Sequence, residues 1–332
     1  MRLLIAGGGT GGHIYPALAV ARSLRARPDA PELVWVGGHR GLEASLVRAA
    51  GIPLHRLVLR SLRTVDLDVH LVLDPVRLAL SVPQAAALLA RLRPAAIFTT
   101  GGYVSVPVLL AARPLGIPAV LWEGNVLPGR SVRLTARLAR VVCVSFAETC
   151  RRLALGGPCY VTGTPIRDVR GLDRTAARER LALRPGDRLL VVFGGSQAAR
   201  RLNAAVAEAL AELVERVVVV HVTGEAGYAE ALANRERLPA ERRERYRPFP
   251  FLRDELLDVL GAADLVVGRA GSSTLAEAAA LGLPLVVVPY PHAGGHQRAN
   301  AEAFVEAGAA RLVEDAAFDG RALLEAAAIL DA

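Results

Sequence analysis

The sequence contains no lysine, so all 40 of its basic side chains are arginines. Against 32 acidic residues they leave a formal net charge of +8. That charge is compatible with a nucleic acid, an anionic membrane surface or a phosphate-bearing substrate. The arginines are scattered and are not interleaved with aromatic residues, as they are in single-strand-binding grooves. We therefore expect no nucleic-acid partner, and the bidentate geometry of arginine favours phosphate groups.

Cysteine is scarce, and long apolar runs are absent. Cys143, Cys150 and Cys159 are odd in number and show no C-x-x-C spacing, which predicts three reduced thiols, as in a cytoplasmic protein, with Cys143 in the core. No apolar run reaches the roughly 18 residues of a membrane-spanning helix. The sequence opens directly on a strand-like run, which predicts that it carries no secretory signal.

Several signatures of cofactor and metal chemistry are also missing. The sequence has no G-x-x-x-x-G-K-[ST], which argues against P-loop hydrolysis. Asp66 and Asp68 form a D-x-D pair, but they lie in an apolar segment and not in a glycine-rich loop. His292 and His296 have no carboxylate ligand beside them, and their spacing fits no standard zinc pattern. We therefore expect neither a metal nor a cofactor.

The apolar residues, 52% of the chain, form short Val/Leu/Ile runs separated by helix-length segments. Such runs are typical of parallel sheets covered by helices on both faces. The two halves repeat this pattern, and a stretch rich in Gly and Pro (156–167) separates them. We predict an α/β protein with two Rossmann-like parallel-sheet domains, residues 1–162 and 163–332, that face a central cleft. The strand-like runs lie at 3–7, 33–37, 96–101, 119–123, 141–145, 189–195, 217–224, 265–271 and 285–290.

Five glycines surround Thr10 between an apolar strand and a helix, and His13 follows them. Glycines let a backbone approach a ligand closely, and the N–H groups at the start of a helix favour an anion. A turn without a ligand needs only one or two glycines, so we interpret this loop as a binding corner. Its spacing also fits a dinucleotide fingerprint, but the second strand ends without an acidic residue. Arg40 leaves an NADP-dependent oxidoreductase as an alternative.

The second half contains a similar corner, where Gly271 and three hydroxyl residues precede a predicted helix. Glu277 lies one turn inside this helix, where it either complements the helix dipole or accepts hydrogen bonds from ribose hydroxyls. A third glycine-rich turn lies at 194–197. Arg167 ends the stretch between the halves, either as a surface arginine or as a contact for a diphosphate.

Together these segments resemble one family, the bacterial N-acetylglucosaminyltransferases called MurG, over nearly the whole chain. The motifs that carry the resemblance are GGGTGGHIYPALAVA at 7–21, GGYVSVP at 101–107, EGN at 123–125, GTPIR at 163–167, GGSQAARRLN at 194–203, RAGSSTLAE at 269–277 and PYPHAGGHQRANA at 289–301. The resemblance implies a GT-B fold. It also implies an inverting transfer of N-acetylglucosamine from UDP-GlcNAc to the C4 hydroxyl of undecaprenyl-pyrophosphoryl-MurNAc-pentapeptide, which converts lipid I to lipid II in peptidoglycan synthesis. The alternatives are another GT-B UDP-sugar enzyme, such as a lipid glycosyltransferase or a sugar-nucleotide epimerase, and a non-catalytic nucleotide-sugar-binding protein.

The resemblance implies binding residues at the matching positions. They are Thr10, Gly11 and Gly12 for the donor or the acceptor, Asn125 for the donor sugar, Arg167 and Ser196 for the diphosphate, Leu252 near the uracil, Ser272, Ser273, Thr274, Leu275, Ala276 and Glu277 for the nucleotide, with Glu277 on the ribose, and Gln297 for the sugar hydroxyls.

His13 is our candidate for the catalytic base, because a neutral imidazole accepts a proton near neutral pH. The alternative is that His13 binds the diphosphate of the acceptor. The chain departs from the family at one motif, where the usual His-Glu-Gln-Asn is Trp122-Glu123-Gly124-Asn125. Any role of that family histidine is absent here, which favours His13 as the base.

Residues 65–93 form a long apolar stretch whose flanking arginines include Arg77 and Arg91. Apolar side chains ringed by arginines are typical of a surface that docks on anionic lipid. The alternative is a buried helix pair, interrupted at Pro75 and Pro83. Because the acceptor has a lipid tail, we expect peripheral contact with the cytoplasmic face of the cell membrane. The other flanking arginines are Arg60, Arg63 and Arg93.

Overall fold

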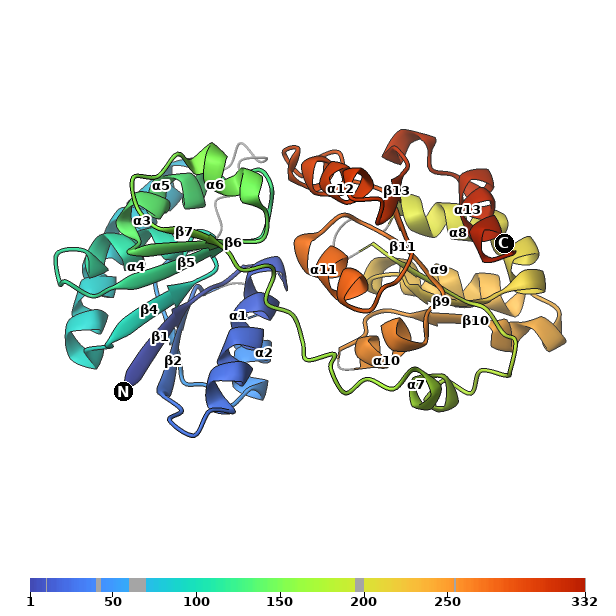
Figure 1. Ribbon diagram of the computed structural model, residues 1–332, viewed down its shortest axis with the longest axis horizontal. Helices are drawn as coiled ribbons and strands as arrows, with labels where there is room; N and C mark the ends of the chain where they lie inside the picture. The colour runs from blue at the N-terminus through green and yellow to red at the C-terminus, as the bar shows by residue number, and fades with distance from the viewer. Residues whose placement is uncertain (10, 40–42, 60–69, 195–199, 254, 332) are drawn as a thin grey trace. The chain divides into compact units, whose positions relative to one another are not determined.

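The computed structural model describes the chain except residues 10, 40–42, 60–69, 195–199, 254 and 332, and it describes only the backbone of 70–75 and 331. The chain divides into two compact units, Met1–Arg167 and Asp168–Ala332. Each unit contains one parallel sheet covered by helices (Figure 1).

The first unit is built on a seven-stranded sheet with the order β3-β2-β1-β4-β5-β6-β7. Its strands are β1 (Arg2–Ala6), β2 (Glu32–Gly37), β3 (Leu54–Arg56), β4 (Ala96–Thr99), β5 (Ala119–Glu123), β6 (Val141–Val144) and β7 (Cys159–Val161). Its helices are α1 (Gly11–Arg25), α2 (Glu43–Ala49), α3 (His70–Leu92), α4 (Ser105–Ala112), α5 (Arg130–Thr135) and α6 (Ala147–Leu153), with a 3₁₀ turn at Ala136–Leu138.

Alternating side chains of these strands face opposite layers of helices, as the period of two in a strand requires. Ile5 of β1 and Trp35 of β2 pack with α1 and α2. Leu4 and Ala6 of β1 pack with α3 and α4 on the other face. Both faces of the sheet are therefore buried, which explains why its strands are almost continuously apolar.

The second unit is built on a six-stranded sheet with the order β10-β9-β8-β11-β12-β13. Leu190 and Val192 pack with α8, α9 and α13, whereas Leu189 and Val191 pack with α7, α10, α11 and α12 on the other face. Its strands are β8 (Leu189–Phe193), β9 (Val218–Val222), β10 (Tyr246–Phe249), β11 (Leu265–Gly268), β12 (Leu285–Val287) and β13 (Ala310–Leu312). Its helices are α7 (Arg174–Arg180), α8 (Arg200–Arg216), α9 (Glu225–Glu236), α10 (Glu255–Ala262), α11 (Ser272–Ala280), α12 (His296–Glu306) and α13 (Gly320–Ala327), with 3₁₀ turns at Ala240–Arg245, Asp315–Ala317 and Ala328–Asp331.

All nine strand-like runs of the sequence are strands, and all pair in parallel, so the α/β prediction is confirmed. The pattern missed four strands, β3, β7, β10 and β13. These four are the edges of the two sheets. An edge strand has a neighbour on one side only and is less enclosed, so its sequence is mixed, as LHR, CYV, YRPF and ARL show.

Helix α3 contradicts one of the two predictions for the apolar stretch, the buried helix pair. The described part of the apolar stretch forms a single helix of 23 residues from His70 to Leu92, and not a helix pair interrupted at prolines. Proline inside a helix removes one backbone hydrogen bond, and packing of the rest of the helix offsets this loss. Ser81, Ala85 and Leu89, spaced by four residues, form its buried face.

The prediction of three reduced thiols is wrong for two cysteines. Cys150 of α6 and Cys159 of β7 form a disulfide, with their Cα atoms 6.0 Å apart. The chain turns back between α6 and β7, so residues nine apart in sequence come within the reach of a disulfide. Cys143 remains a free thiol. It is half-buried and not fully in the core, and burial raises its pKa.

Candidate functional site

The strand order of each sheet identifies the edge where a ligand is expected. In the first sheet, β1 pairs with β2 on one side and with β4 on the other. In the second sheet, β8 pairs with β9 and β11 in the same way. The strands that follow each central strand are therefore added first on one side of it and later on its other side. Ligands of open α/β sheets bind at such switch points, beyond the carboxyl ends of the strands. The glycine-rich corners of the sequence follow these strands.

His13 lies at the switch point of the first unit, in the first turn of α1. Its Nδ1 is 2.7 Å from the carbonyl oxygen of Thr100, in the loop that follows β4. The Thr100 hydroxyl in turn donates to the His13 carbonyl, at 2.8 Å. Because a carbonyl oxygen only accepts, Nδ1 must carry the proton of the neutral ring, which leaves Nε2 as a proton acceptor. None of the described residues hydrogen-bonds to Nε2.

The two glycines before His13 begin helix α1. Gly11 is half-buried and Gly12 is exposed, and both lie where the backbone N–H groups have no partner inside the helix. Gly102, with φ of +75°, packs against His13, and a Cβ there would lie 3.5 Å from Nε2. The loops after β1 and β4 thus meet at the imidazole. Thr10 lies outside the described residues.

The next strand, β5, ends in the buried carboxylate of Glu123, which is 4% exposed. One of its oxygens accepts from the backbone N–H and the side-chain amide of Asn125, at 2.9 and 2.8 Å. The other accepts from the backbone N–H of Gly129, at 2.9 Å. Thr149 donates to the Asn125 carbonyl, at 2.9 Å. Asn125 is therefore held at the carboxyl edge of the sheet.

Trp122 precedes this carboxylate, at the position where the MurG family usually has histidine. Its side chain is 2% exposed, and its indole N–H donates to the Gly163 carbonyl, at 3.0 Å. The indole thus fixes the segment that leads to Arg167. Arg167 is half-buried and is the last residue of the first unit.

In the second unit, helix α11 begins after β11 at the switch point. Gly271 precedes the helix in an extended conformation, and no side chain caps its N-terminus. The Ser273 hydroxyl is buried and has no hydrogen-bond partner among the residues that the structure describes. Buried hydroxyls are normally satisfied, so this one is suited to a ligand. Glu277 is 7% exposed and lies one turn further along the helix. Thr274 and Ala276 are half-buried, as is Ser272, and Leu275 is fully buried.

Helix α12 packs against the same corner. The Asn300 side chain donates to the Ala270 carbonyl, at 3.2 Å. The Gln297 side-chain oxygen accepts from the backbone N–H of Tyr290, at 2.9 Å, which closes the loop before α12. Arg269, 5% exposed, donates to the Val288 carbonyl at 3.0 Å and pairs with Asp315. The structure therefore brings Ser272–Glu277 together with the start of α12.

The remaining predicted residues are Leu252 and Ser196. Leu252 is 8% exposed and packs in the core with β8, β9 and α10, so its side chain contributes to the fold. Ser196 lies outside the described residues.

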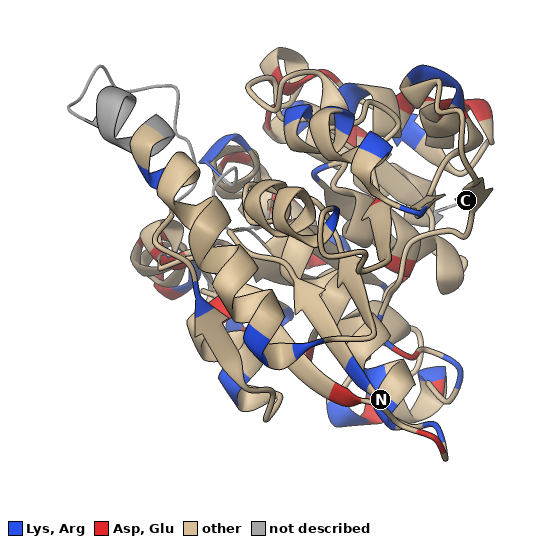
Figure 2. Ribbon diagram, turned by 90° about the vertical axis from the view of Figure 1, so that its left-hand side faces the viewer, with Lys and Arg blue, Asp and Glu red and all other residues tan. Residues whose placement is uncertain are grey.

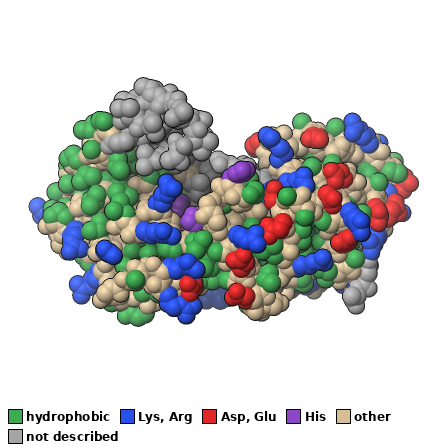
Figure 3. Space-filling view, turned by 90° about the horizontal axis from the view of Figure 1, so that it is seen from above, with side chains coloured by type: hydrophobic (Ala, Val, Ile, Leu, Met, Phe, Trp, Pro, Cys, Tyr) green, Lys and Arg blue, Asp and Glu red, His purple; other side chains and the backbone are tan. Residues whose placement is uncertain are grey.

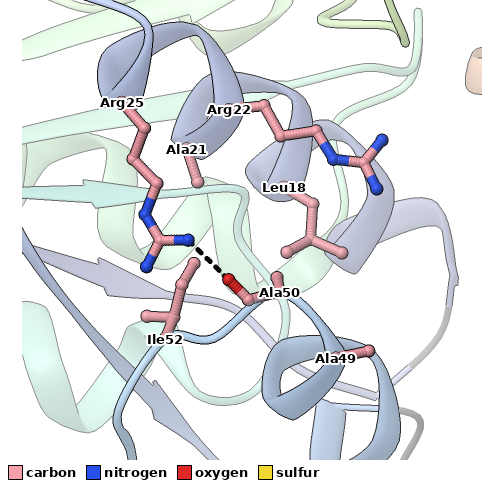
Figure 4. A pocket seen from close by; sticks show the side chains of 7 residues that line it. All are labelled: Leu18, Ala21, Arg22, Arg25, Ala49, Ala50 and Ile52. Carbon is pink, nitrogen blue, oxygen red and sulfur yellow. Dashed lines mark hydrogen bonds between the residues drawn. The ribbon is translucent and has the colours of Figure 1, made fainter.

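Two hollows lie at the opposite edge of the first sheet. One has a volume of about 270 Å³ and is lined by the C-terminal half of α1 and by the segment after α2 (Figure 4). Arg25 reaches across it to the Ala50 carbonyl (Figure 4). Since α1 starts at the carboxyl edge of the sheet, its C-terminal end marks the amino edge. The second hollow, of about 250 Å³, lies before β6 and β7, at that same edge. Neither contains a predicted site residue.

Sequence reasoning missed two buried groups that organise the first corner, Glu43 and the Thr100 carbonyl. Glu43 is 1% exposed and accepts hydrogen bonds from Gly9 and Gly38. No local pattern marks it, because Gly9 lies 34 residues away in sequence. Glu123 did carry a signal, since a carboxylate that ends an apolar strand seldom lies buried without a role.

The part of the chain that the structure describes contains no group of three or more His, Cys, Asp or Glu side chains arranged to hold a metal ion. Asp66 and Asp68 lie outside that part. Among the described helices, none has the length and apolar character needed to cross a membrane.

The fold and the corners define a protein of the GT-B class. Models of the glycosyltransferase family 28 N-terminal and C-terminal domains match residues 3–144 and 189–331. The chain is 41% identical, over 98% of its own length and 89% of the relative, to a Moorella thermoacetica protein named UDP-N-acetylglucosamine–N-acetylmuramyl-(pentapeptide) pyrophosphoryl-undecaprenol N-acetylglucosamine transferase. The crystal structure of Acinetobacter baumannii MurG matches with a TM-score of 0.75 and 27% identity, over 100% of this chain and 91% of that one. The chain belongs to the MurG family.

The fold alone is shared more widely. A putative UDP-N-acetylglucosamine 2-epimerase from Listeria monocytogenes matches with a TM-score of 0.70 over 100% of this chain and 88% of that one, but at 16% identity. The GT-B fold therefore does not by itself distinguish a transferase from an epimerase.

Proposed function

We propose that this protein transfers N-acetylglucosamine from UDP-GlcNAc to the C4 hydroxyl of undecaprenyl-pyrophosphoryl-MurNAc-pentapeptide, so that lipid I becomes lipid II. The observation that carries the mechanism is the contact between His13 Nδ1 and the Thr100 carbonyl, at 2.7 Å. It fixes the tautomer in which Nε2 accepts a proton.

In this mechanism His13 is the general base of a single displacement. Nε2 takes the proton of the C4 hydroxyl as that oxygen forms a bond to C1 of the donor sugar. The bond between C1 and the diphosphate breaks at the same time, and UDP leaves with the electron pair. Inversion at C1 follows from one displacement.

The first unit accordingly binds the acceptor. The N–H groups of Gly11 and Gly12 lie at the positive end of the α1 dipole, a suitable place for the acceptor diphosphate. Thr10 remains a predicted contact here. Asn125, oriented by Glu123, contributes to binding of the donor sugar.

The second unit binds the donor nucleotide. The unsatisfied Ser273 hydroxyl and the uncapped start of α11 are suited to the diphosphate of UDP. Glu277 accepts hydrogen bonds from the ribose hydroxyls, and Gln297 contacts the sugar. Arg167 and Ser196 neutralise and bind the diphosphate as it leaves. Ser272, Thr274, Leu275 and Ala276 frame the nucleotide through the first turns of α11. Because the Leu252 side chain is only 8% exposed, we expect this residue to contact the uracil mainly through its backbone.

The test is transfer of labelled N-acetylglucosamine to a lipid-linked muramoyl-pentapeptide, with His13→Ala and His13→Asn compared. Asparagine can still donate to the Thr100 carbonyl but cannot act as a base. We expect both variants to lose about 10²- to 10⁴-fold in kcat. His55→Ala, in the edge strand β3, is the matched histidine control and should retain activity.

Other outcomes discriminate between the hypotheses. If His13 only binds the acceptor diphosphate, the substitutions raise KM for the acceptor and leave kcat nearly unchanged. Absence of transfer by the unsubstituted protein would refute the main proposal. Release of UDP without an acceptor, together with epimerised N-acetylglucosamine, would identify a sugar-nucleotide epimerase.

We further propose that the first unit docks on the cytoplasmic face of the cell membrane. The lipid tail of the acceptor requires an approach to the bilayer. The described part of α3 carries few charges along its length (Figure 2) and exposes Val76 and Leu80 to 51% and 59%. Apolar side chains gather on this unit, with arginines beside them, whereas both signs of charge are interspersed on the second unit (Figure 3). Arg77 and Arg91 flank the apolar face of α3, in the arrangement that binds anionic lipid.

This docking is tested by sedimentation with vesicles that contain an anionic phospholipid. Arg77→Glu combined with Arg91→Glu should weaken binding, because each arginine near such a surface contributes about 1 kcal/mol. Arg237→Glu combined with Arg321→Glu alters the net charge equally, on the second unit, and is the control. Unchanged binding of the first double variant would contradict the proposal.

A further inference from the structure

The buried carboxylate of Glu43 lies beneath the glycine-rich loop that leads to His13. Glu43 is the first residue of α2, and it is 1% exposed. A buried carboxylate is costly unless its oxygens are hydrogen-bonded. The partners that satisfy it therefore indicate what it holds in place.

Those partners come from three different loops at the carboxyl edge of the sheet. Oε2 accepts from the backbone N–H of Gly9, after β1, at 3.2 Å. Oε1 accepts from the backbone N–H of Gly38, after β2, at 3.0 Å. Oε1 also accepts from the Tyr103 hydroxyl, after β4, at 3.3 Å. One carboxylate thus joins three loops.

The neighbouring glycines make room for this group. A Cβ on Gly8 would lie 2.6 Å from Oε1 of Glu43, and a Cβ on Gly37 would lie 2.9 Å from its Cγ. A Cβ on Gly38 would lie 2.5 Å from the Tyr103 hydroxyl oxygen. Glycine at these positions therefore leaves the space that the buried Glu43 carboxylate and the Tyr103 hydroxyl occupy.

Two of the three loops are the ones that hold His13. Gly9 lies four residues before it, in the segment that sets the start of α1. Tyr103 follows the Thr100 carbonyl that fixes Nδ1 and the Gly102 backbone that packs on the ring. Burial, with the nearby Glu43, raises the pKa of Tyr103, so its hydroxyl keeps the proton that it donates.

We propose that Glu43 is a positioning residue of the transfer reaction: it ties the loops after β1 and β4 together and so holds the imidazole of His13 where it accepts the proton of the attacking hydroxyl. This inference rests on the proposed function, in which His13 is the base. Glu43 itself does not touch the substrate.

Glu43→Gln is the informative substitution, because glutamine has nearly the same shape but only one acceptor oxygen. Its NH₂ group must face either Gly9 or Gly38, whose N–H then loses its partner. We expect kcat to fall about 10- to 100-fold, as for a small displacement of a catalytic group. KM for UDP-GlcNAc should stay within about twofold, because most of the proposed donor residues belong to the other unit, and Asn125 and Arg167 lie outside the three loops that Glu43 joins.

Amide hydrogen exchange supplies a readout that does not depend on activity. In Glu43→Gln, exchange in a peptide covering residues 4–14 should accelerate about tenfold or more, while a peptide covering 189–194 is unchanged. Leu153→Ala is the matched control. Leu153 of α6 is 8% exposed and packs with β5 and β6, not with β1, so its truncation destabilises the same unit away from these loops. At a temperature where it stays folded, Leu153→Ala should retain kcat and the exchange of residues 4–14.

The outcomes separate the two proposals. A fall in kcat together with faster exchange at 4–14 supports the role of Glu43. Normal kcat, or normal exchange at 4–14, overturns it. If Glu43→Gln does not fold, Glu43→Asp receives the same measurements, because a carboxylate shorter by one methylene cannot reach both Gly9 and Gly38. Absence of transfer by the unsubstituted protein counts against the proposed function, and the exchange result still decides whether Glu43 holds the loop.

Discussion

His221 should make the second unit sensitive to mild acid, although it lies away from the proposed chemistry. It belongs to β9 and is 1% exposed. The Asn203 amide nitrogen donates to the Thr223 carbonyl at 2.9 Å, so its oxygen faces His221 Nε2, also at 2.9 Å. Nε2 is therefore the protonated nitrogen, and Nδ1 accepts from the Tyr246 hydroxyl, at 2.9 Å. The neutral ring has both of its hydrogen bonds.

Protonation of this ring is unfavourable in the folded protein. Burial lowers the pKa of His221 from 6.5 to about 3. Between these values the unfolded chain binds the proton and the folded chain does not, so stability is complete above pH 6.5 and decreases as the pH falls toward 3. The loss is about 1.4 kcal/mol per pH unit, hence about 2.7 kcal/mol at pH 4.5, two units below the unfolded value.

The assay is urea unfolding at pH 7.5 and pH 4.5, with His221→Gln as the variant that does not titrate. Both tryptophans, Trp35 and Trp122, lie in the first unit, so their fluorescence follows that unit and circular dichroism follows both. The unsubstituted second unit should lose about 2.7 kcal/mol more than the variant between these pH values. Parallel losses in the two proteins would refute the reasoning.

Three further predictions concern other buried contacts. Cys150→Ser should lower the free energy of unfolding by about 2–3 kcal/mol, as expected for a disulfide that closes a short loop. In the unsubstituted protein, alkylation before and after reduction should count one and three reactive thiols. Trp122→Phe removes the hydrogen bond to Gly163 and should cost about 0.5–1.5 kcal/mol in urea unfolding. Asp315→Asn removes the carboxylate that pairs with the buried Arg269 guanidinium and should destabilise the second unit by about 3 kcal/mol, with a lower melting temperature; an unchanged melting temperature would contradict it.

The interior of the fold could be predicted from the sequence because burial acts on every residue of a central strand. Runs such as LLVVF are apolar at each position, since both faces of the sheet are covered. The edge strands could not be predicted, because a segment such as LHR pairs with a neighbour on one side only and shows no regular alternation of apolar and polar residues. The disulfide could not be predicted for a related reason. Its formation depends on how α6 turns back onto β7, which cysteine spacing alone does not specify.

The candidate site could be predicted only in part. The positions of the corners could be predicted, because the order of strand, glycine-rich loop and helix is a local feature of the sequence. The tautomer of His13 and the burial of Glu43 depend on residues 87 and 34 positions away in sequence. Likewise, Asn203 in the GGSQAARRLN motif hydrogen-bonds to His221. This contact cannot be predicted from the sequence before β9 is placed beside β8.

The glycines of the two corners therefore have different structural roles, although the two corners have similar sequences. In the first corner, Gly8 has no room for a Cβ because Glu43 occupies it. In the second, a Cβ on Gly271 would meet only the Thr274 hydroxyl, at 3.8 Å, among the residues that the structure describes. The number of glycines in a corner is therefore a poor measure of how closely a ligand approaches its backbone. Two polar atoms without a hydrogen-bond partner among the described residues, Nε2 of His13 and the Ser273 hydroxyl, lie at the switch points, one in each unit, where a ligand of such a sheet is expected.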